Sequence, residues 1–361
     1  MYTIPPKKMV ITNILDILKK YTDMDHRLTQ AEIADILKNE YYMEVDRKTV
    51  KRNLLNLLDL NCGIDYTEVT RTDKQGNDTS ICTDWYITRE FDDSELRLLI
   101  DSVIFSKTIP RKQCHDLVKK IKSLSNVYFD KKVGNIYSLP ESRPENKELF
   151  YTIDILDEAI SKGKKVSFVY NSYGTDKKLH PKREEKYIVN PYQMAATNGR
   201  YYLICNYDKY DTLSNYRIDR ITGIKTLNES RKPVKELQEG EINLPKHMAE
   251  HLYMFAGESI HAKFKAKDYI IDQVIDWFGL SPRITKLNED ECIVEVDVNK
   301  EAFFCWSMQY GMHIDVLEPL DIRERIKNSA KYMWEKYKEI IIFLHLNIVY
   351  RLFFCKKRFL F

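Results

Sequence analysis

The segment 199–221, GRYYLICNYDKYDTLSNYRIDRI, constrains the fold most strongly because it holds two strand patterns in a short length. Residues 201–205 form a β-branched and aromatic run, which is typical of a strand. Asn198 and Gly199 precede this run and predict a turn that leads into it. A second strand is predicted at 216–221. The middle of the chain is therefore expected to be β-rich, and we interpret it as a small β-barrel.

The second strand carries Arg217 and Arg220 within one short stretch of sequence. The guanidinium fork suits a phosphate or carboxylate, and nearby tyrosines can stack on bases. The segment therefore predicts a ligand site. The alternative is that the arginines are solvated or paired locally, for instance with Asp219, and that the tyrosines pack in the core.

Composition limits the class of protein. A chain of 361 residues with 43% hydrophobic and 31% charged residues suggests a globular protein of two or three domains. Its seven cysteines are scattered and never spaced as CxxC, so neither a disulfide framework nor a zinc site is predicted, and a reducing cytoplasm is expected. Residues 338–361 carry a local charge of +4, which leaves −1 for the rest of the net +3. Residues 164–231, in contrast, hold 13 basic and 7 acidic residues, a local +6.

The first 90 residues predict a helix-turn-helix with a hairpin after it. Apolar residues recur at helical spacing over 7–21, and Thr29 with Glu32 forms a capping box for a second helix. Asp46 is expected to cap a third helix. Two strands at 64–71 and 80–87, with a polar loop between them, predict a wing.

The third helix is basic near its N-terminus, which is the end of a recognition helix that enters the major groove. The residues expected to contact DNA from this helix are Lys48, Thr49, Lys51 and Arg52. Arg71 and Lys74 of the wing are expected to lie against phosphates. The alternative is an ordinary solvated face, and Leu55, which falls on the basic side, supports that alternative.

The rest of the chain divides by pattern. Residues 92–129 predict helices, one opened by Pro110 in its first turn, that form a dimerisation arm or a spacer. A linker at 131–148 leads to a helix at 149–161 and five short strands, and from residue 261 strands and helices alternate as in an α+β module. The apolar stretch near the C-terminus is too short and too polar for a membrane anchor, so none is expected.

The chain resembles the bacterial WYL-domain transcriptional regulators over about residues 7–337. The motifs that carry the resemblance are Tyr201-Tyr202-Leu203, Asn190-Pro191-Tyr192, YRIDRI at 216–221 and WSMQYGMHIDVLEP at 306–319. The resemblance implies an α+β multidomain protein with five parts: a winged helix-turn-helix (1–90), a helical linker or dimerisation arm (91–148), an Sm-like β-barrel WYL domain (149–232), a C-terminal α+β WCX extension (233–337) and an apolar basic tail (338–361) with no counterpart in the family.

In such proteins the WYL pocket is implicated in binding a nucleotide or single-stranded nucleic acid. By resemblance, the effector site would comprise Arg217, Arg220, Tyr202, Tyr192, Tyr170 and His180. Strand alternation puts the two arginines on opposite faces. Both reach one ligand only if the strand ends or bulges between them, so Arg217 is the preferred candidate and Arg220 is alternatively a brace for the barrel.

Two residues depart from the family pattern. Tyr201 replaces the tryptophan, and Asn53 stands where an aspartate commonly follows the recognition-helix arginine, Arg52. The expected function is a dimeric, cytoplasmic, ligand-responsive transcriptional regulator that binds double-stranded DNA. The alternative is a nucleotide or nucleic-acid sensor in defence or damage response whose N-terminal head binds protein. No enzyme activity, metal site or cofactor is expected, because no nucleophile–base pair or phosphate-cradling glycine loop is present in the sequence.

Overall fold

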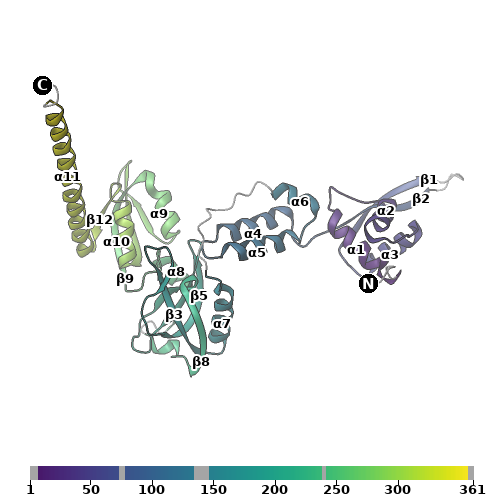
Figure 1. Ribbon diagram of the computed structural model, residues 1–361, viewed down its shortest axis with the longest axis horizontal. Helices are drawn as coiled ribbons and strands as arrows, with labels where there is room; N and C mark the ends of the chain where they lie inside the picture. Colours follow the sequence, from purple (N-terminus) through teal and green to yellow (C-terminus); the bar gives the residue numbers. More distant parts are fainter. Residues whose placement is uncertain (1–6, 73–77, 134–145, 238–240, 357–361) are drawn as a thin grey trace. The chain divides into compact units, whose positions relative to one another are not determined.

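The computed structural model describes residues 7–72, 78–133, 146–237 and 241–356 (Figure 1). The chain divides into two compact units, Met1–Lys147 and Glu148–Phe361. Most of the predicted linker at 131–148 lies outside the described residues.

The first unit begins with three helices and an antiparallel hairpin, as the sequence predicts. After a 3-10 turn, η1 (Lys7–Met9), the elements are α1 (Val10–Tyr21), α2 (Gln30–Tyr41), α3 (Arg47–Asp59), β1 (Ile64–Thr72) and β2 (Asp78–Ile87). Their apolar faces enclose one core, whose largest buried members are Ile14, Ile17, Leu18, Ile33, Leu37, Leu54 and Trp85.

Local chemistry explains where these helices begin. The predicted capping box is present, with the Thr29 hydroxyl accepting from the Glu32 amide while the Glu32 carboxylate accepts from the Thr29 amide. Asp46 caps α3 by accepting from the Thr49 amide at 2.9 Å. Each cap satisfies amide groups that have no partner within the helix.

Three further helices complete the first unit: α4 (Asp93–Phe105), α5 (Arg111–Lys122) and α6 (Val127–Lys132). Pro110 is the N-cap of α5 and not part of its first turn, so the predicted position was wrong by one residue. Asn126 joins α6 to the N-terminal core by donating to the Asp23 carboxylate at 2.6 Å, and Tyr128 stacks on His26 at 3.6 Å between ring centroids.

The second unit opens with a helix packed on a six-stranded sheet. The elements are α7 (Leu149–Ser161), β3 (Lys164–Tyr173), β4 (Leu179–Pro181), β5 (Tyr187–Thr197), β6 (Arg200–Asn206), β7 (Ser214–Arg217), the 3-10 turn η3 (Ile218–Arg220) and β8 (Ile221–Ser230). The strand order is β4-β3-β5-β6-β7, and β8 pairs with β3. Asn198 and Gly199 form the predicted tight turn, both with positive φ, between the paired residues Thr197 and Arg200.

Three sequence expectations for this sheet were wrong. The sheet curls into a half-barrel in place of a closed barrel, because in the described residues β7 and β8 are joined by η3 and do not pair with each other. The strand predicted at 216–221 ends at Arg217. His180, expected in a loop, lies in β4, opposite Ser172 of β3.

The remainder of the second unit is an α+β module, as predicted. Its elements are η4 (Val234–Glu236), α8 (Leu244–Glu250), β9 (Ser259–Lys267), η5 (Asp268–Ile270), α9 (Ile271–Phe278), β10 (Arg283–Lys286), β11 (Glu291–Asn299), α10 (Lys300–Gln309), β12 (Ile314–Glu318) and α11 (Leu320–Lys356). The sheet order β10-β11-β9-β12 is antiparallel throughout. Helices α9 and α10 cover one face, where Phe264, Phe303 and Trp306 are fully buried. Strand β10 and helix α8 were not predicted.

The last helix, α11, continues to Lys356 without a break. Across the described part of the chain, no helix combines the length and apolar character that crossing a membrane requires.

Candidate functional sites

A basic surface lies at the N-terminal end of α3. Lys48, Lys51 and Arg52 are exposed, and within the described residues none of them forms an ion pair or a side-chain hydrogen bond. Arg71, on β1 of the hairpin, is also exposed. These cations are therefore free to meet an anionic partner. Lys74, the other predicted contact on the hairpin, lies outside the described residues.

Two neighbours of this surface have local structural roles. The Thr49 hydroxyl donates to Asp46 at 3.1 Å, so it belongs to the cap of α3. The Asn53 amide donates to the Thr49 carbonyl at 2.8 Å, so it does not pair with Arg52. Leu55, which argued for an ordinary solvated face, is half-buried against the core and is not part of the exposed basic surface.

The Arg217 side chain is held by a buried carboxylate. Its Nε and one terminal nitrogen donate to the two oxygens of Asp219 at 3.0 and 2.6 Å, and the Asp219 side chain is fully buried. Burial alone would lower the pKa of Arg217, but the hydrogen bonds and charge of Asp219 outweigh it and raise that pKa. Arg217 therefore stays charged while its fork is mostly occupied.

Arg220 has the opposite environment. Its Nε is buried without a hydrogen-bond partner, and no ion pair of its guanidinium is present among the described residues. The guanidinium carbon lies 5.9 Å from the centre of the Tyr173 ring. A buried, unsatisfied donor on a cation is costly. The Arg220 guanidinium, unlike that of Arg217, has no carboxylate bound to it in the described residues, so it is the better candidate to bind an anion. This geometry reverses the preference for Arg217 that strand alternation suggests.

The two arginines lie near one tyrosine in spite of the alternation rule, because η3 turns the chain between them. The Tyr170 hydroxyl accepts from the Arg217 amide at 3.3 Å. Burial raises the pKa of Tyr170, and the charges of Arg220 and Arg217 both act against that rise. The structure thus brings Tyr170, Arg217 and Arg220 together.

Aromatic rings from several strands cluster next to these residues. Tyr216 packs edge-on against Tyr170 and Tyr187 at 4.8 and 5.5 Å, and its hydroxyl is 2.7 Å from that of Tyr207. The Arg183 guanidinium carbon lies 3.6 Å from the centre of the Tyr187 ring. Half-buried rings beside cations suit the stacking of a base.

The other predicted effector residues have different surroundings. Tyr202 lies opposite Arg217 in the β6–β7 ladder but packs in an apolar cluster with Ile204 and Met254. The Tyr192 hydroxyl shares its proton between two acceptors, Asn206 Oδ1 at 3.1 Å and the Lys232 carbonyl at 3.0 Å, and burial raises the pKa of Tyr192 to about 12. His180 pairs with Asp176 at 2.9 Å at an exposed position.

Sequence reasoning missed Tyr187, Tyr207 and Arg183 as members of this site. Arg183 and Tyr187 belong to the basic and aromatic stretch KREEKY, which was a detectable signal. Tyr207 carried no such signal, because its place beside Tyr216 depends on how β6 and β7 pair.

Two domain families match this second unit. Residues 151–226 match the WYL domain and residues 258–334 match the WCX domain. The second unit therefore contains a WYL domain followed by a WCX domain. Its WYL domain spans α7 and the half-barrel up to the middle of β8, and it contains Arg217, Arg220 and the tyrosine cluster. Its WCX domain spans β9 to the first half of α11.

Two solved structures resemble this chain at low sequence identity. Proteasome accessory factor B/C (PafBC) of Arthrobacter aurescens has a TM-score of 0.28 and 13% identity over 90% of this chain, which spans only 48% of the PafBC chain. A CRISPR Cas-related protein has a TM-score of 0.38 and 15% identity over 92% of this chain and 85% of its own. Both scores are low, so neither structure bears on function. No curated protein sequence matches the chain significantly.

Proposed function

We propose that this protein is a ligand-responsive transcriptional regulator. Its N-terminal head would bind duplex DNA as a winged helix-turn-helix, and its WYL domain would bind a nucleotide or single-stranded nucleic acid. The observation that carries the proposal is that the second unit holds a buried arginine donor without a hydrogen-bond partner, Arg220 Nε, close to the tyrosine cluster. The exposed basic end of α3 belongs to the first unit.

The DNA-binding part follows from the geometry of the head. A third helix with exposed lysines and arginine in its first turns, followed by a hairpin, has the arrangement that places a recognition helix in the major groove. Lys48, Lys51, Arg52 and Arg71 would neutralise phosphates, since in the described residues they have no acidic partner of their own.

The effector-binding part follows from charge and burial. A phosphate oxygen would accept from Arg220 and from the Arg217 nitrogen that Asp219 leaves free, while the base would stack on the half-buried Tyr216 or Tyr207 ring. These interactions bind the ligand without reacting with it, so we propose no turnover of the ligand.

A dimer is part of the proposal. A single head with a handful of phosphate contacts would bind near the non-specific range, about 10⁻⁴ to 10⁻⁶ M. Two heads on a two-fold operator supply the additional affinity.

The test of DNA binding is the salt dependence of the variant Lys51→Ala/Arg52→Ala. Each lost phosphate contact lowers the slope of log affinity against log salt by about 0.9, so the double variant should lower it by roughly two. The matched control is Lys327→Ala/Lys331→Ala, which removes two exposed lysines from α11. Binding of promoter DNA with an unchanged slope in the α3 variant would refute the assignment of the head.

A further inference from the structure

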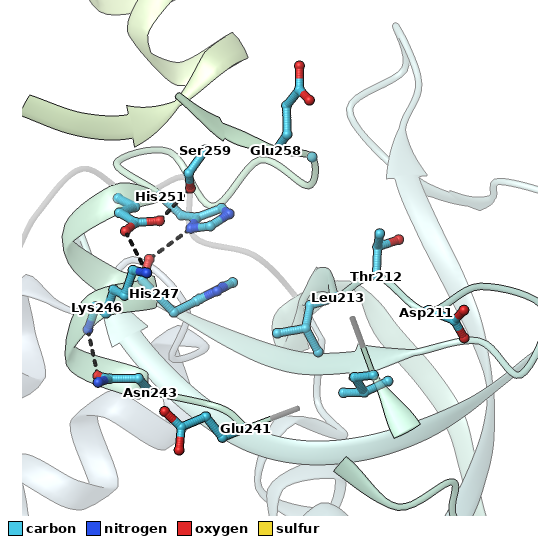
Figure 2. Close-up of a pocket in the computed structure, with 13 residues that line it drawn as sticks. Asp211, Thr212, Leu213, Glu241, Asn243, Lys246, His247, His251, Glu258 and Ser259 are labelled. Carbon is cyan, nitrogen blue, oxygen red and sulfur yellow. Dashed lines mark hydrogen bonds and ion pairs between the residues drawn. The ribbon is translucent and has the colours of Figure 1, made fainter. Parts of the chain in front are cut away.

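A cavity of about 780 Å³ lies beside the WYL half-barrel, away from the arginine site described above. Its walls come from residues 211–213 before β7, from Leu237 and Glu241, from helix α8 with its flanking residues Asn243 and His251, and from residues 257–259 at the start of β9 (Figure 2). The volume is in the range of small-molecule sites. Because the first wall precedes β7 and the last begins the WCX sheet, a molecule in the cavity would contact both domains.

Two buried histidines of the α8 wall stack on each other, with ring centroids 4.0 Å apart. His251 Nδ1 donates to the His247 carbonyl at 2.9 Å, because a carbonyl can only accept. His247 Nε2 donates to the Asn215 amide oxygen at 3.2 Å. In the neutral rings, His251 Nε2 and His247 Nδ1 are therefore acceptors, and neither has a partner among the described residues.

Glu250 adds a buried negative charge to the same wall. Its side chain is 12% exposed, and one oxygen accepts from the Ser259 hydroxyl. Its counter-ion, Lys246, is 3.7 Å away and 70% exposed, beyond hydrogen-bonding distance. A buried carboxylate without a close cation retains most of its desolvation cost. The site therefore favours a cation that enters the cavity and bonds directly to Glu250.

We propose that this cavity binds a small organic cation with a guanidinium or amine head and a short aliphatic chain. The N–H donors would bond Glu250 and the free nitrogens of His251 and His247, while Leu213 and Leu237 would cover the chain. Figure 2 shows the His247 ring extending from α8 toward the side of the cavity where Leu213 lies. A phosphate is disfavoured, because four carboxylates line the cavity against one lysine: Asp211, Glu241, Glu250 and Glu258. Asp211 and Glu258 pair with Lys232 and Lys300, which are not part of the lining, so the uncompensated negative charge comes from Glu241 and Glu250. Nor does any group of three suitable side chains in the described residues offer a metal site.

The cavity is linked to the effector site through one strand. His247 bonds Asn215 of β7, and Arg217 ends the same strand two residues later. A ligand that rearranges the His247 ring would act on β7 directly. Binding in the cavity does not depend on the proposed DNA-binding function, so the two can fail separately.

The experiment is isothermal titration calorimetry of the full-length protein at pH 7.5 with agmatine, which carries both a guanidinium and an amine. Glu250→Gln should weaken agmatine binding at least about tenfold, because it removes the charge and keeps the shape. Lys246→Ala should tighten binding, at most severalfold, because it removes the weak attraction between the exposed Lys246 ammonium and Glu250, 3.7 Å apart. The matched control, Glu229→Gln, changes an exposed carboxylate on β8 and should leave binding unchanged.

Three results would overturn the proposal. They are no heat with agmatine or putrescine at millimolar concentrations, binding that Glu250→Gln and His251→Phe leave unaltered, or weaker binding in Lys246→Ala. Circular dichroism would check the folding of each variant. If Glu250→Gln is unfolded, Lys246→Ala still tests the proposal. The Lys246 side chain is mostly exposed, so its removal should not disturb the fold, and a damaged fold would in any case weaken binding and not tighten it.

Discussion

Arg217→Ala tests whether the Arg217–Asp219 pair is a structural element of the half-barrel as well as part of a ligand site. The substitution leaves the Asp219 carboxylate, which is fully buried, without the guanidinium that donates to both of its oxygens. Removing one partner of a buried ion pair costs about 3–5 kcal/mol, because the remaining charge loses its bidentate counter-ion. Arg217 is 15% exposed, so water can partly replace it and the lower end, about 3 kcal/mol, is expected.

The measurement is equilibrium unfolding in urea, followed by circular dichroism, for the wild type, Arg217→Ala, Asp219→Asn and the double variant. Because the two side chains are in direct contact, the double variant should be more stable than the sum of the single changes predicts, by at least about 1 kcal/mol. Additive effects, or a loss below about 1 kcal/mol in Arg217→Ala, would refute the reasoning. The result also decides how ligand binding is tested, since a destabilised Arg217→Ala protein loses its ligand for a trivial reason.

Three further predictions follow from other residues. Arg220→Ala should remove nucleotide binding at little cost in stability, because it eliminates an unsatisfied buried donor; retained binding of AMP by calorimetry would exclude Arg220 from the site. Burial first, and the charge of His251 second, lower the pKa of His247 from 6.5 to about 4. Between these two pH values the unfolded chain binds a proton that the folded chain does not. The free energy of unfolding should therefore fall as the pH drops from 6.5 to 4, by roughly 3 kcal/mol in total. His247→Gln should flatten the dependence of stability on pH in that range. Thr29→Ala should destabilise the first unit by about 1 kcal/mol in urea unfolding, through loss of the capping box, whereas Lys119→Ala, at an exposed position on α5, should have less effect.

Local features of the fold could be predicted from the sequence because neighbouring residues cause them. The capping box of Thr29 and Glu32, the Asp46 cap and the turn at Asn198 and Gly199 all form as expected. Each depends on hydrogen bonds or backbone angles within a few residues, so the sequence alone contains the information. Most strands and helices of the second unit followed from their local patterns as well, but α8, β4 and β10 did not.

The candidate effector site could be predicted only in part. The sequence placed Tyr170, Arg217 and Arg220 among the candidates, and the structure brings these three together. It placed Tyr192 and His180 there as well, but their side chains are engaged with Asn206 and Asp176.

The arginine segment shows most clearly where the sequence was insufficient. Two arginines in a strand pattern predicted an anion site, but strand alternation gave no way to bring both to one ligand. The tertiary structure decided this by ending β7 at Arg217 and turning the chain through η3, and it also decided that Arg217 is paired while Arg220 Nε is not. The physical reason is that backbone preferences act over a few residues, whereas the burial and pairing of a charged side chain depend on strands that are distant in the sequence.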